Sequence, residues 1–408
     1  MSKKELFAID NSKLFYHTRE QISAGKDSFE VSDESVWPST QISSNGEYLG
    51  QIHVSPDQNK VDPFIMNASE LNVWTKTMMN YVSSMSDLTA DVFDILTIEW
   101  LKHANHVHDT IEINVDDILR YRGITPRLNG NQRSSGYRPD QRESIAKQIQ
   151  LLDHIWIEAE REIYSNGDSQ KKTQKLKGRA IHLHLEFREQ DEDGNTELLL
   201  IRARPGDMFA HTLLNGRQTA LMSKKALEYD VDKFPYEKRL TRYLSYIWRI
   251  RQQNASYTDT IRVQTLLDAI KLPLNKKRPL RTWERLEKAL ERLEKDRVVK
   301  SFQFENADMN IIGRRGWSKK MLEWKVQIVP PDEISSHYIQ ITSPTSMPTQ
   351  ISGIAKKVKE KRESLALSLS QASEQIGVNV ATLSRIENQK VSSIRGSTKK
   401  KIESWLQI

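Results

Sequence analysis

Two histidines separated by one leucine stand in the stretch Ile-His-Leu-His-Leu, at His182 and His184. Alternation of this kind is typical of a β-strand and would place both imidazoles on one face. Paired imidazoles can hold a divalent metal ion, and a tyrosine beside it could attack a phosphodiester bond, with Tyr243 and Tyr246 as candidate nucleophiles. The strand would serve equally well in a hairpin that exposes both rings to solvent.

This pattern is similar to the His-hydrophobe-His strand of nucleases that start rolling-circle replication and conjugation, which would imply metal-dependent nicking. No clear third metal ligand accompanies this pair. A second cluster of histidines could also bind a metal ion, but it could equally be a solvated helix end: His103, His106 and His108. The chain has no cysteine and no Gly-x-x-x-x-Gly-Lys-[Ser/Thr] phosphate loop, which excludes thiolate chemistry and argues against an ATPase motor. We therefore expect a protein that is not an enzyme and uses no metal or cofactor, with nicking as an alternative.

A second informative pattern is a pair of short helices expected on either side of Gly377. Leu383 and Ile386 follow at helical spacing, so the second helix can cross the first closely and bury both side chains. The other side chains would face outward, where they could contact DNA bases: Asn379, Val380, Ala381, Thr382, Ser384 and Arg385. An ordinary helix pair with a glycine turn is the alternative.

Residues 377–388 resemble the Cro/repressor-like helix-turn-helix family, and the resemblance extends over residues 354–408. That family usually has glutamine at the start of the helix that precedes the glycine turn, where the side chain contacts a DNA phosphate. The register set by Gly377 puts Leu369 at this position, and Gln371 is nearby. The resemblance implies a DNA-binding helix bundle whose phosphate contact has changed.

Positive charge is concentrated in the second half of the chain, although the net charge is only +7 over 408 residues. Residues 201–350 hold 28 Lys and Arg against 17 Asp and Glu, and residues 351–408 hold 11 against 5. Residues 1–200 hold 22 against 32. This distribution of charge is typical of a chain whose C-terminal domains bind a polyanion such as double-stranded DNA. A solvated, lysine-rich surface is the alternative.

Composition and length predict a folded protein of two to four domains, because 37% of the residues are hydrophobic and 9 are tryptophan. The chain has no apolar stretch of about 18 residues, and its first residues lack the apolar core of a signal peptide. We expect a cytoplasmic, nucleoid-associated protein with no membrane contact. Residues 1–63 are polar without a sustained period and are expected to be flexible.

Residues 64–200 predict a first winged-helix domain. Apolar residues stripe two helices, a strand covers 110–114, a short helix ends by Gly123, and Pro139 opens a third helix. Strands at 155–159 and 180–187 are expected to pair as a hairpin. The arginines of this domain are candidate phosphate contacts: Arg120, Arg122, Arg127, Arg133, Arg138 and Arg142.

The same order recurs over residues 201–330 and predicts a second winged-helix domain. Three helices are expected around 240–250, 262–270 and 281–296, followed by strands at 298–304 and 321–329. An Arg-Pro pair introduces each third helix, at Arg138 and at Arg278. Basic residues before and along the third helix, and on the hairpin tip, are placed to neutralise phosphates: Lys276, Lys277, Arg278, Arg281, Arg285, Arg314, Arg315, Lys319 and Lys320.

The second half of that third helix interleaves glutamates with lysines and arginines, which favours a solvated surface of i to i+4 ion pairs. Residues 331–353 are rich in Pro, Ser and Thr and predict a linker to the terminal bundle at 354–408. The predicted fold is mainly α with small β-hairpins, an α+β chain of two tandem winged-helix domains and a C-terminal helix-turn-helix bundle.

Two winged-helix units in tandem resemble theta-type plasmid replication initiators. The segments that carry the resemblance are 116–123 (Asp-Asp-Ile-Leu-Arg-Tyr-Arg-Gly) with 136–139 (Gly-Tyr-Arg-Pro), and 239–249 with 286–290 (Leu-Glu-Lys-Ala-Leu). The resemblance implies a protein of a plasmid or other mobile element that binds repeated or palindromic DNA sites, could form a homodimer and recruits host replication factors. A Cro-like tail is not general among those initiators, which leaves a transcriptional repressor or regulator, or a partition protein, as the alternative.

Overall fold

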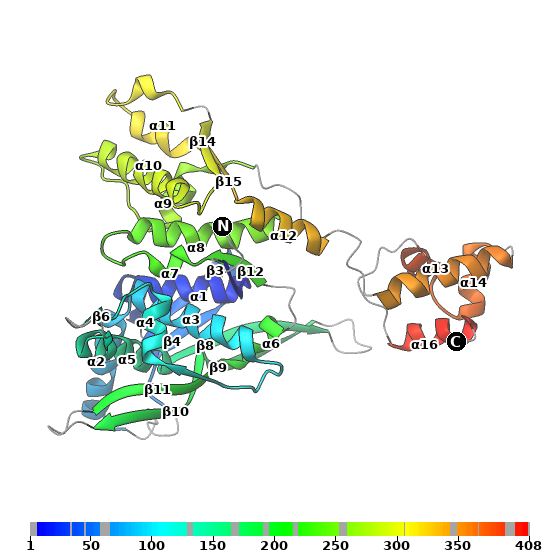
Figure 1. Cartoon of the computed structure of the whole chain (residues 1–408), viewed down its shortest axis with the longest axis horizontal. Helices are drawn as coiled ribbons and strands as arrows, with labels where there is room; N and C mark the ends of the chain where they lie inside the picture. The colour runs from blue at the N-terminus through cyan, green and yellow to red at the C-terminus, as the bar shows by residue number, and fades with distance from the viewer. Residues whose placement is uncertain are drawn as a thin grey trace. The chain divides into compact units, whose positions relative to one another are not determined.

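The computed structural model describes residues 6–32, 35–44, 46–57, 66–128, 134–164, 171–190, 196–214, 219–252, 259–305, 307–342, 349–365, 367–387 and 396–406. Contacts divide the chain into two compact units, Met1–Pro331 and Asp332–Ile408. The fold is a mixture of helices and small antiparallel sheets, as the α+β prediction requires (Figure 1). Within the described ranges, no helix combines the length and apolar character that a membrane crossing needs.

The described residues of this region (6–32, 35–44 and 46–57) form helices and strands, so the prediction of a flexible segment at 1–63 is wrong there. The elements are β1 (Leu6–Asp10), α1 (Lys13–Ala24), the short helix η2 (Gly25–Asp27), β2 (Glu30–Ser32), β3 (Ser35–Ser44) and β4 (Glu47–Val54). Phe15, Ile22, Ile42 and Ile52 are fully buried in the core of the first unit. Ile42 and Ile52 stand singly among polar residues, and β4 pairs with the distant strand β8 as well as with its neighbour β3, so no local period revealed these strands.

A first group of helices follows, and it starts with α2 (Ala68–Ser84) and α3 (Asp87–His103). The strand β5 (Ile111–Asn114) leads into α4 (Val115–Tyr121), and the short strands β6 (Arg127–Leu128) and β7 (Ser134–Gly136) precede α5 (Pro139–Asp153). Asn114 caps α4 by accepting a hydrogen bond from the Asp116 amide at 2.9 Å, as its position predicts. Helices α3, α4 and α5 pack on one another, which forms the three-helix arrangement expected of this region.

Two successive hairpins follow α5, where the sequence predicted one. They consist of β8 (Ile155–Tyr164) with β9 (Lys171–Arg179), and β10 (Ile181–Gln190) with β11 (Thr196–Pro205). The predicted pairing of 155–159 with 180–187 is therefore wrong. Lys177 on β9 lies 2.8 Å from Glu158 on β8 and forms a cross-strand ion pair with it. The predicted boundary after residue 200 falls inside β11.

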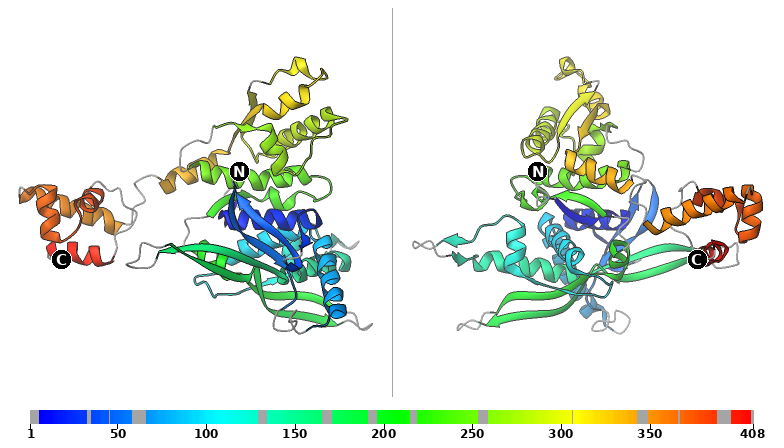
Figure 2. Two further views of the ribbon diagram at one scale, coloured as in Figure 1. Left: turned by 180° about the vertical axis from the view of Figure 1, so that it is seen from behind. Right: turned by 45° about the vertical axis from the view of Figure 1, so that its right-hand side comes forward.

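These strands belong to two separate antiparallel sheets. One has five strands in the order β2-β3-β4-β8-β9, so the N-terminal strands pair with the first hairpin through β4 and β8. The other has the order β10-β11-β5, so the strand that precedes α4 pairs with the second hairpin. Figure 2 shows the long β10–β11 ribbon near the bottom of both views.

The second group of helices repeats this arrangement. After α6 (Asp207–Leu214), β12 (Thr219–Ser223), which pairs with β1, and α7 (Lys225–Glu228), the chain forms α8 (Pro235–Gln252), β13 (Ile261–Arg262), α9 (Val263–Ala269) and α10 (Pro279–Lys295). The strands β14 (Ser301–Glu305) and β15 (Lys325–Val329) form a hairpin, and β13 pairs with β15 in the order β13-β15-β14. In both groups the short strand before the middle helix thus pairs with the second strand of the hairpin.

The hairpin of the second group contains helices that the sequence did not suggest. The short helix η3 (Met309–Ile311) and α11 (Trp317–Glu323) lie between β14 and β15, so the strand predicted at 321–329 begins only at Lys325. Trp317 and Met321, four residues apart, are buried, and α11 packs against α9. Lys319 and Lys320 are therefore carried by a packed helix rather than by a hairpin tip.

A buried layer of ion pairs joins α3, from the first group, to α8, from the second. Asp87, Asp91 and Asp94 lie on one face of α3 because they are four and three residues apart. The Arg242 guanidinium contacts all three: Nε lies 2.9 Å from Asp94, Nη2 2.6 Å from Asp91 and Nη1 3.2 Å from Asp87. Because each carboxylate meets a cation, the layer links the two groups through buried and directional contacts.

The second unit consists of α12 (Asp332–Thr342), α13 (Thr349–Ser364), α14 (Leu369–Ile376), α15 (Val380–Glu387) and α16 (Gly396–Leu406). Its small core contains Val358, Ala372, Ile376, Leu383, Ile386 and Ile402. Helix α12 and the start of α13 occupy much of the predicted linker at 331–353, and Pro344 and Pro348 lie outside the described residues. The prediction followed composition and overlooked the spacing of Ile334 and Tyr338, which are buried one helical turn apart.

Candidate nucleic-acid interface

Helix α10 is strongly amphipathic and presents a charged face. Its buried residues are Thr282, Trp283, Leu286, Ala289, Leu290 and Leu293. Arg281, Glu284, Arg285 and Lys288 are exposed on the opposite side. Pro139 in α5 and Pro279 in α10 both occupy the first turn, where a proline needs no backbone N–H partner. The long helix of each group thus begins at the Arg-Pro pair that the sequence indicated.

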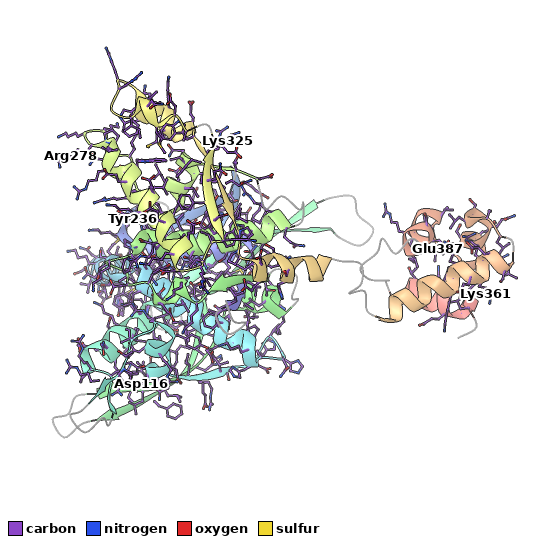
Figure 3. All side chains as sticks on the ribbon, turned by 45° about the horizontal axis from the view of Figure 1, so that its top comes forward. Asp116, Tyr236, Arg278, Lys325, Lys361 and Glu387 are labelled. Carbon is purple, nitrogen blue, oxygen red and sulfur yellow. The ribbon has the colours of Figure 1, made fainter. Side chains whose placement is uncertain are left out.

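The turn before α10 exposes three consecutive cations, Lys276, Lys277 and Arg278. The Asn275 side chain fixes this turn, because its Oδ1 accepts hydrogen bonds from the amides of Lys277 at 3.0 Å and Arg278 at 2.9 Å. Figure 3 shows Arg278 at the edge of this group of helices. The backbone is therefore held while the charged side chains extend into solvent.

Most of the predicted cations of the second group have no carboxylate partner. Among the residues that the structure describes, no ion pair involves the side chains of Lys276, Lys277, Arg278, Arg281, Arg314, Arg315, Lys319 or Lys320, and all eight are exposed. Arg285 is also exposed, and its Nη1 lies 3.4 Å from the Tyr236 hydroxyl. Uncompensated cations on neighbouring elements repel one another in the free protein, and an anionic partner would relieve this repulsion.

The ion pairs expected along the second half of α10 are absent from the described structure. Arg292 instead stacks over the Phe234 ring, with its guanidinium carbon 4.8 Å from the ring centre. The Glu287 carboxyl has a raised pKa, because it is partly buried and lies near Glu291 and Glu284. The distal half of the helix therefore carries acidic charge that the nearby cations do not neutralise by direct contact.

Two arginines of the first group that were predicted to contact DNA instead pair with carboxylates of the folded chain. Arg142 on α5 makes a bidentate pair with Asp116 on α4, with Nε 2.7 Å from Oδ1 and Nη2 2.8 Å from Oδ2. Arg122 donates from Nε to the buried Asp91 at 3.1 Å. Both arginines hold helices together, so the interpretation of them as DNA contacts is not supported. Neither contact could be predicted from the sequence, because the carboxylates lie 26 and 31 residues away.

The other arginines of the first group are more accessible. Arg120 is 71% exposed and lies 2.5 Å from Asp117, and Arg138 lies 3.2 Å from Asp140. Arg127 is exposed on β6, whereas Arg133 lies outside the described residues. The accessible cations of the first group are fewer, and at least two of them have an acidic neighbour. Its attraction for an anion is therefore weaker than that of the second group.

The helix pair around Gly377 has the predicted geometry. Gly377 ends α14 in the left-handed conformation with φ 73°, and Leu383 and Ile386 are buried. Asn379, Val380 and Arg385 are exposed, Thr382 and Ser384 are partly exposed, and Ala381 lies in α15 between them. Gln371 is exposed, and its Oε1 accepts from the Ser368 amide at 2.9 Å in a capping box, so half of its amide is already engaged.

The two histidines of the metal-site hypothesis lie on β10, with ring centres 6.2 Å apart. A bulge between Leu183 and Leu185 changes the register at His184, and His182 Nε2 lies 3.6 Å from Asp207. Burial lowers the pKa of both imidazoles. In the described part of the chain, no three His, Cys, Asp or Glu side chains are grouped so that they could hold a metal ion.

The candidate nucleophiles are held in a packed environment on α8. Tyr246 stacks on Tyr16 at 4.0 Å between ring centres, and burial raises the pKa of Tyr243 to about 12. A phenol with a raised pKa forms little phenolate at neutral pH, which disfavours its use in attack on phosphorus. His103 and His106 are exposed at and beyond the end of α3, as a solvated helix terminus would have them.

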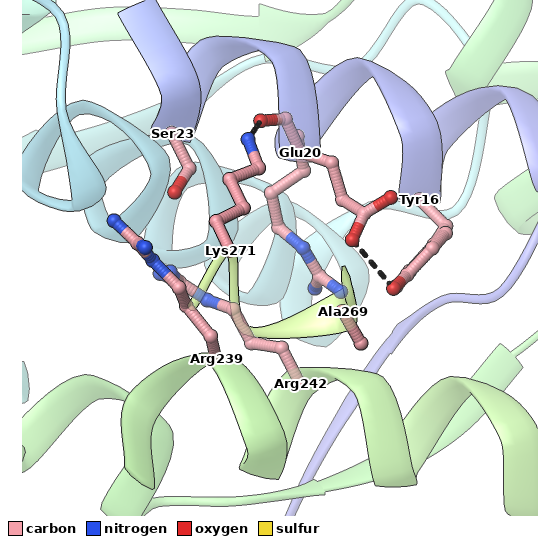
Figure 4. Close-up of a pocket in the computed structure, with 8 residues that line it drawn as sticks. Tyr16, Glu20, Ser23, Arg239, Arg242, Ala269 and Lys271 are labelled. Atoms are coloured by element: carbon pink, nitrogen blue, oxygen red, sulfur yellow. Dashed lines mark hydrogen bonds between the residues drawn. The ribbon is translucent and has the colours of Figure 1, made fainter. Parts of the chain in front are cut away.

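Sequence reasoning missed one small cationic cavity next to the ion-pair layer (Figure 4). It is lined by Tyr16, Arg19, Glu20, Ser23, Arg239, Arg242, Ala269 and Lys271. Burial lowers the pKa of Lys271 to about 8, and its Nζ donates to the Glu20 carbonyl. Arg19 and Arg239 are bound to Asp94 and Asp87, so the cavity is an extension of the layer. It could not be foreseen while α1 was expected to be flexible.

No family model and no curated protein matches this chain. Two solved structures are similar to parts of it, and both contain domains 2 and 3 of RctB. One aligns with a TM-score of 0.37 and 14% identity over 67% of this chain and 85% of the other. The second aligns with a TM-score of 0.41 and 16% identity over 76% of this chain and 94% of the other. Values this low describe a partial likeness of backbone path and do not extend to activity.

Proposed function

We propose that this chain binds double-stranded DNA mainly through the second group of helices, with α10 in the major groove and the hairpin that carries α11 along the backbone. The observation that carries the proposal is a set of exposed cations on the turn before α10, on its first half and around α11, which have no carboxylate partner among the residues that the structure describes. Lysine and arginine side chains in such places neutralise phosphates and release condensed counterions.

The two groups of helices are proposed to be winged-helix units. Each has a helix, a short strand, a short helix, a long helix and a hairpin, with the short strand paired to the second hairpin strand. In such units the third helix enters the major groove and the hairpin contacts the neighbouring backbone. The first unit contributes less to binding, because Arg122 and Arg142 are held by carboxylates of the fold.

The helix pair α14 and α15 is proposed as a further DNA-binding element, with Thr382 and Arg385 close to bases. Support comes from the left-handed turn at Gly377 and from the burial of Leu383 and Ile386, which leave the other face of α15 outward. Arg385 is exposed and has no ion pair among the described residues. A second site on one chain raises the local concentration of each element at the DNA.

The proposed biological role is initiation of replication at an origin with repeated sites, on a plasmid or other mobile element, with recruitment of host replication factors. The tandem order of the two groups supports this role through the resemblance to theta-type initiators. A transcriptional regulator is the second candidate, and the repressor-like helix pair in the second unit favours it. Both roles need the same DNA-binding surfaces and differ in the proteins that they recruit.

Binding is tested by fluorescence anisotropy with the full chain and a labelled duplex of random sequence at about 50 and 200 mM salt. We expect saturable binding at low salt that weakens steeply as salt rises, and a flat titration at low salt would remove the proposal. The role is tested by footprinting on the DNA that flanks the gene and by plasmid maintenance. Replication that depends on the gene supports initiation, whereas gene-dependent repression without replication supports the regulator.

A further inference from the structure

Leu280 is the exception on an otherwise strictly amphipathic helix. The other apolar residues of α10 face the core, whereas the side chain of Leu280 is 43% exposed in the first turn. It follows Pro279 and precedes Arg281, and Arg278 and Arg281 are both exposed without an ion pair in the described structure. An apolar group thus lies among accessible positive charges.

This setting identifies the kind of partner. A protein surface that covered Leu280 with an apolar groove would also have to desolvate the cations beside it, which is unfavourable without acidic partners. A nucleic acid supplies the opposite charge along its backbone and offers one apolar group in the major groove, the 5-methyl group of thymine. The combination of exposed leucine and unpaired arginines therefore fits duplex DNA.

We propose that Leu280 recognises a thymine in the DNA site by packing against its 5-methyl group. The inference rests on the proposed entry of α10 into the major groove and adds a base preference to it. Glu284 is one helical turn further along, exposed, and has no ion pair among the described residues. Leu280 and Glu284 therefore share a face that extends towards base edges, while Arg278 and Arg281 contact phosphates.

The experiment uses the full chain and duplexes recovered from a random-sequence library by repeated binding at moderate salt. Each thymine of an enriched duplex is replaced by deoxyuridine, which lacks only the 5-methyl group. We expect one substitution within the segment protected by α10 to weaken wild-type binding about fourfold, which is the effect of one methyl group taken out of water. Leu280→Ala should bind both forms of that duplex equally.

Leu365→Ala is the matched control, because Leu365 is also an exposed leucine, at 51%, and lies in the other unit. It should keep the wild-type penalty for deoxyuridine. A penalty that persists in Leu280→Ala, a uniform lack of penalty in the wild type, or a library that is retained without enrichment would each overturn the inference while DNA binding stands. A library that is not retained at all would instead remove the proposed function.

Discussion

The Lys238 ammonium lies 2.8 Å from Asp91 Oδ1 and 2.9 Å from Oδ2, and neither side chain is exposed to solvent. Lys238 also donates to the carbonyl oxygens of Ala226 and Leu227, so its donors are satisfied. Burial lowers the pKa of Lys238 to about 8, although Asp91 acts in the opposite direction. This pair joins α3 to α8 at the centre of the ion-pair layer. Loss of either partner would leave the other as an uncompensated buried charge.

Replacement of Asp91 by asparagine should therefore destabilise the chain strongly. Lys238, Arg242 and Arg122 all contact this carboxylate, and its loss leaves an excess of buried positive charge. We expect a decrease of about 3 to 5 kcal/mol in the free energy of unfolding, measured by urea denaturation. Asp117→Asn is the control, because it removes the carboxylate of an exposed pair and should cost less than about 1 kcal/mol. Similar losses in the two variants would contradict the importance assigned to the layer.

Asp10 should make stability depend on pH in the acidic range. Burial raises the pKa of Asp10 from 3.8 to about 6, against the hydrogen bonds from Ser12 and Thr212. The folded state thus holds a proton that the unfolded state has lost, and this stabilisation is complete below pH 3.8 and disappears as the pH rises through about 6.

At neutral pH the buried Asp10 carboxylate opposes folding, so Asp10→Asn should raise the Tm at pH 7.5. The difference between a pKa of 3.8 and one of about 6 corresponds to at most about 3 kcal/mol. Thermal unfolding of both proteins between pH 4 and 7.5 checks this, and the two Tm values should converge towards pH 4. Asp232→Asn, at an exposed carboxylate, should leave the curve unchanged. A lower Tm for Asp10→Asn at pH 7.5 would show that the hydrogen bonds outweigh the burial.

Neutralising Arg314 and Arg315 together should weaken binding to all DNA sequences to a similar extent. Each phosphate contact that is lost lowers the slope of log affinity against log salt by about 0.9, so Arg314→Gln with Arg315→Gln should reduce it by about 1.8. Anisotropy titrations across a salt series measure the slope. Lys224→Gln with Lys225→Gln removes the same charge where both lysines pair with Glu228, and it should change the slope little. Equal effects of the two pairs would indicate that only net charge matters.

Replacing Thr382 and Arg385 by alanine should reduce sequence preference without unfolding the second unit. Neither side chain belongs to the core, which Leu383 and Ile386 form. The loss of base contacts should lower the discrimination between preferred and random duplexes by roughly 1 to 3 kcal/mol. Selection from a random library with variant and wild-type chains measures the preference. Lys357→Ala, at an exposed lysine of α13, is the control, and an unchanged profile in the double variant would exclude base contact by α15.

Periodicity predicted the parts of the fold that depend on local spacing. The stripe of Trp283, Leu286, Leu290 and Leu293 indicated α10, and Gly377 with Leu383 and Ile386 indicated the helix pair, because each pattern lies within one or two elements. Strand β1 was missed because its partner, β12, lies more than 200 residues away. Long-range pairing leaves no local signal in a single sequence.

The same limit applies to the candidate interface. The sequence shows where arginines stand and does not show which carboxylates face them. Arg142 and Arg281 both lie near the start of the long helix that follows an Arg-Pro pair, yet Arg142 is fixed by Asp116 and Arg281 is accessible. The sequence did not single out the acidic row on α3, and only its contact with Lys238 and Arg242 reveals a buried layer.

The ion-pair layer has a consequence for the DNA that such a chain can use. Since α3 belongs to one group of helices and α8 to the other, the buried contacts between them keep α5 and α10 at a set angular offset. The two DNA half-sites contacted by α5 and α10 would then have to keep a constant rotational position relative to each other around the duplex axis. An insertion of about five base pairs, half a turn of the duplex, would rotate one half-site to the far side, whereas an insertion of a full turn would restore the facing but lengthen the gap.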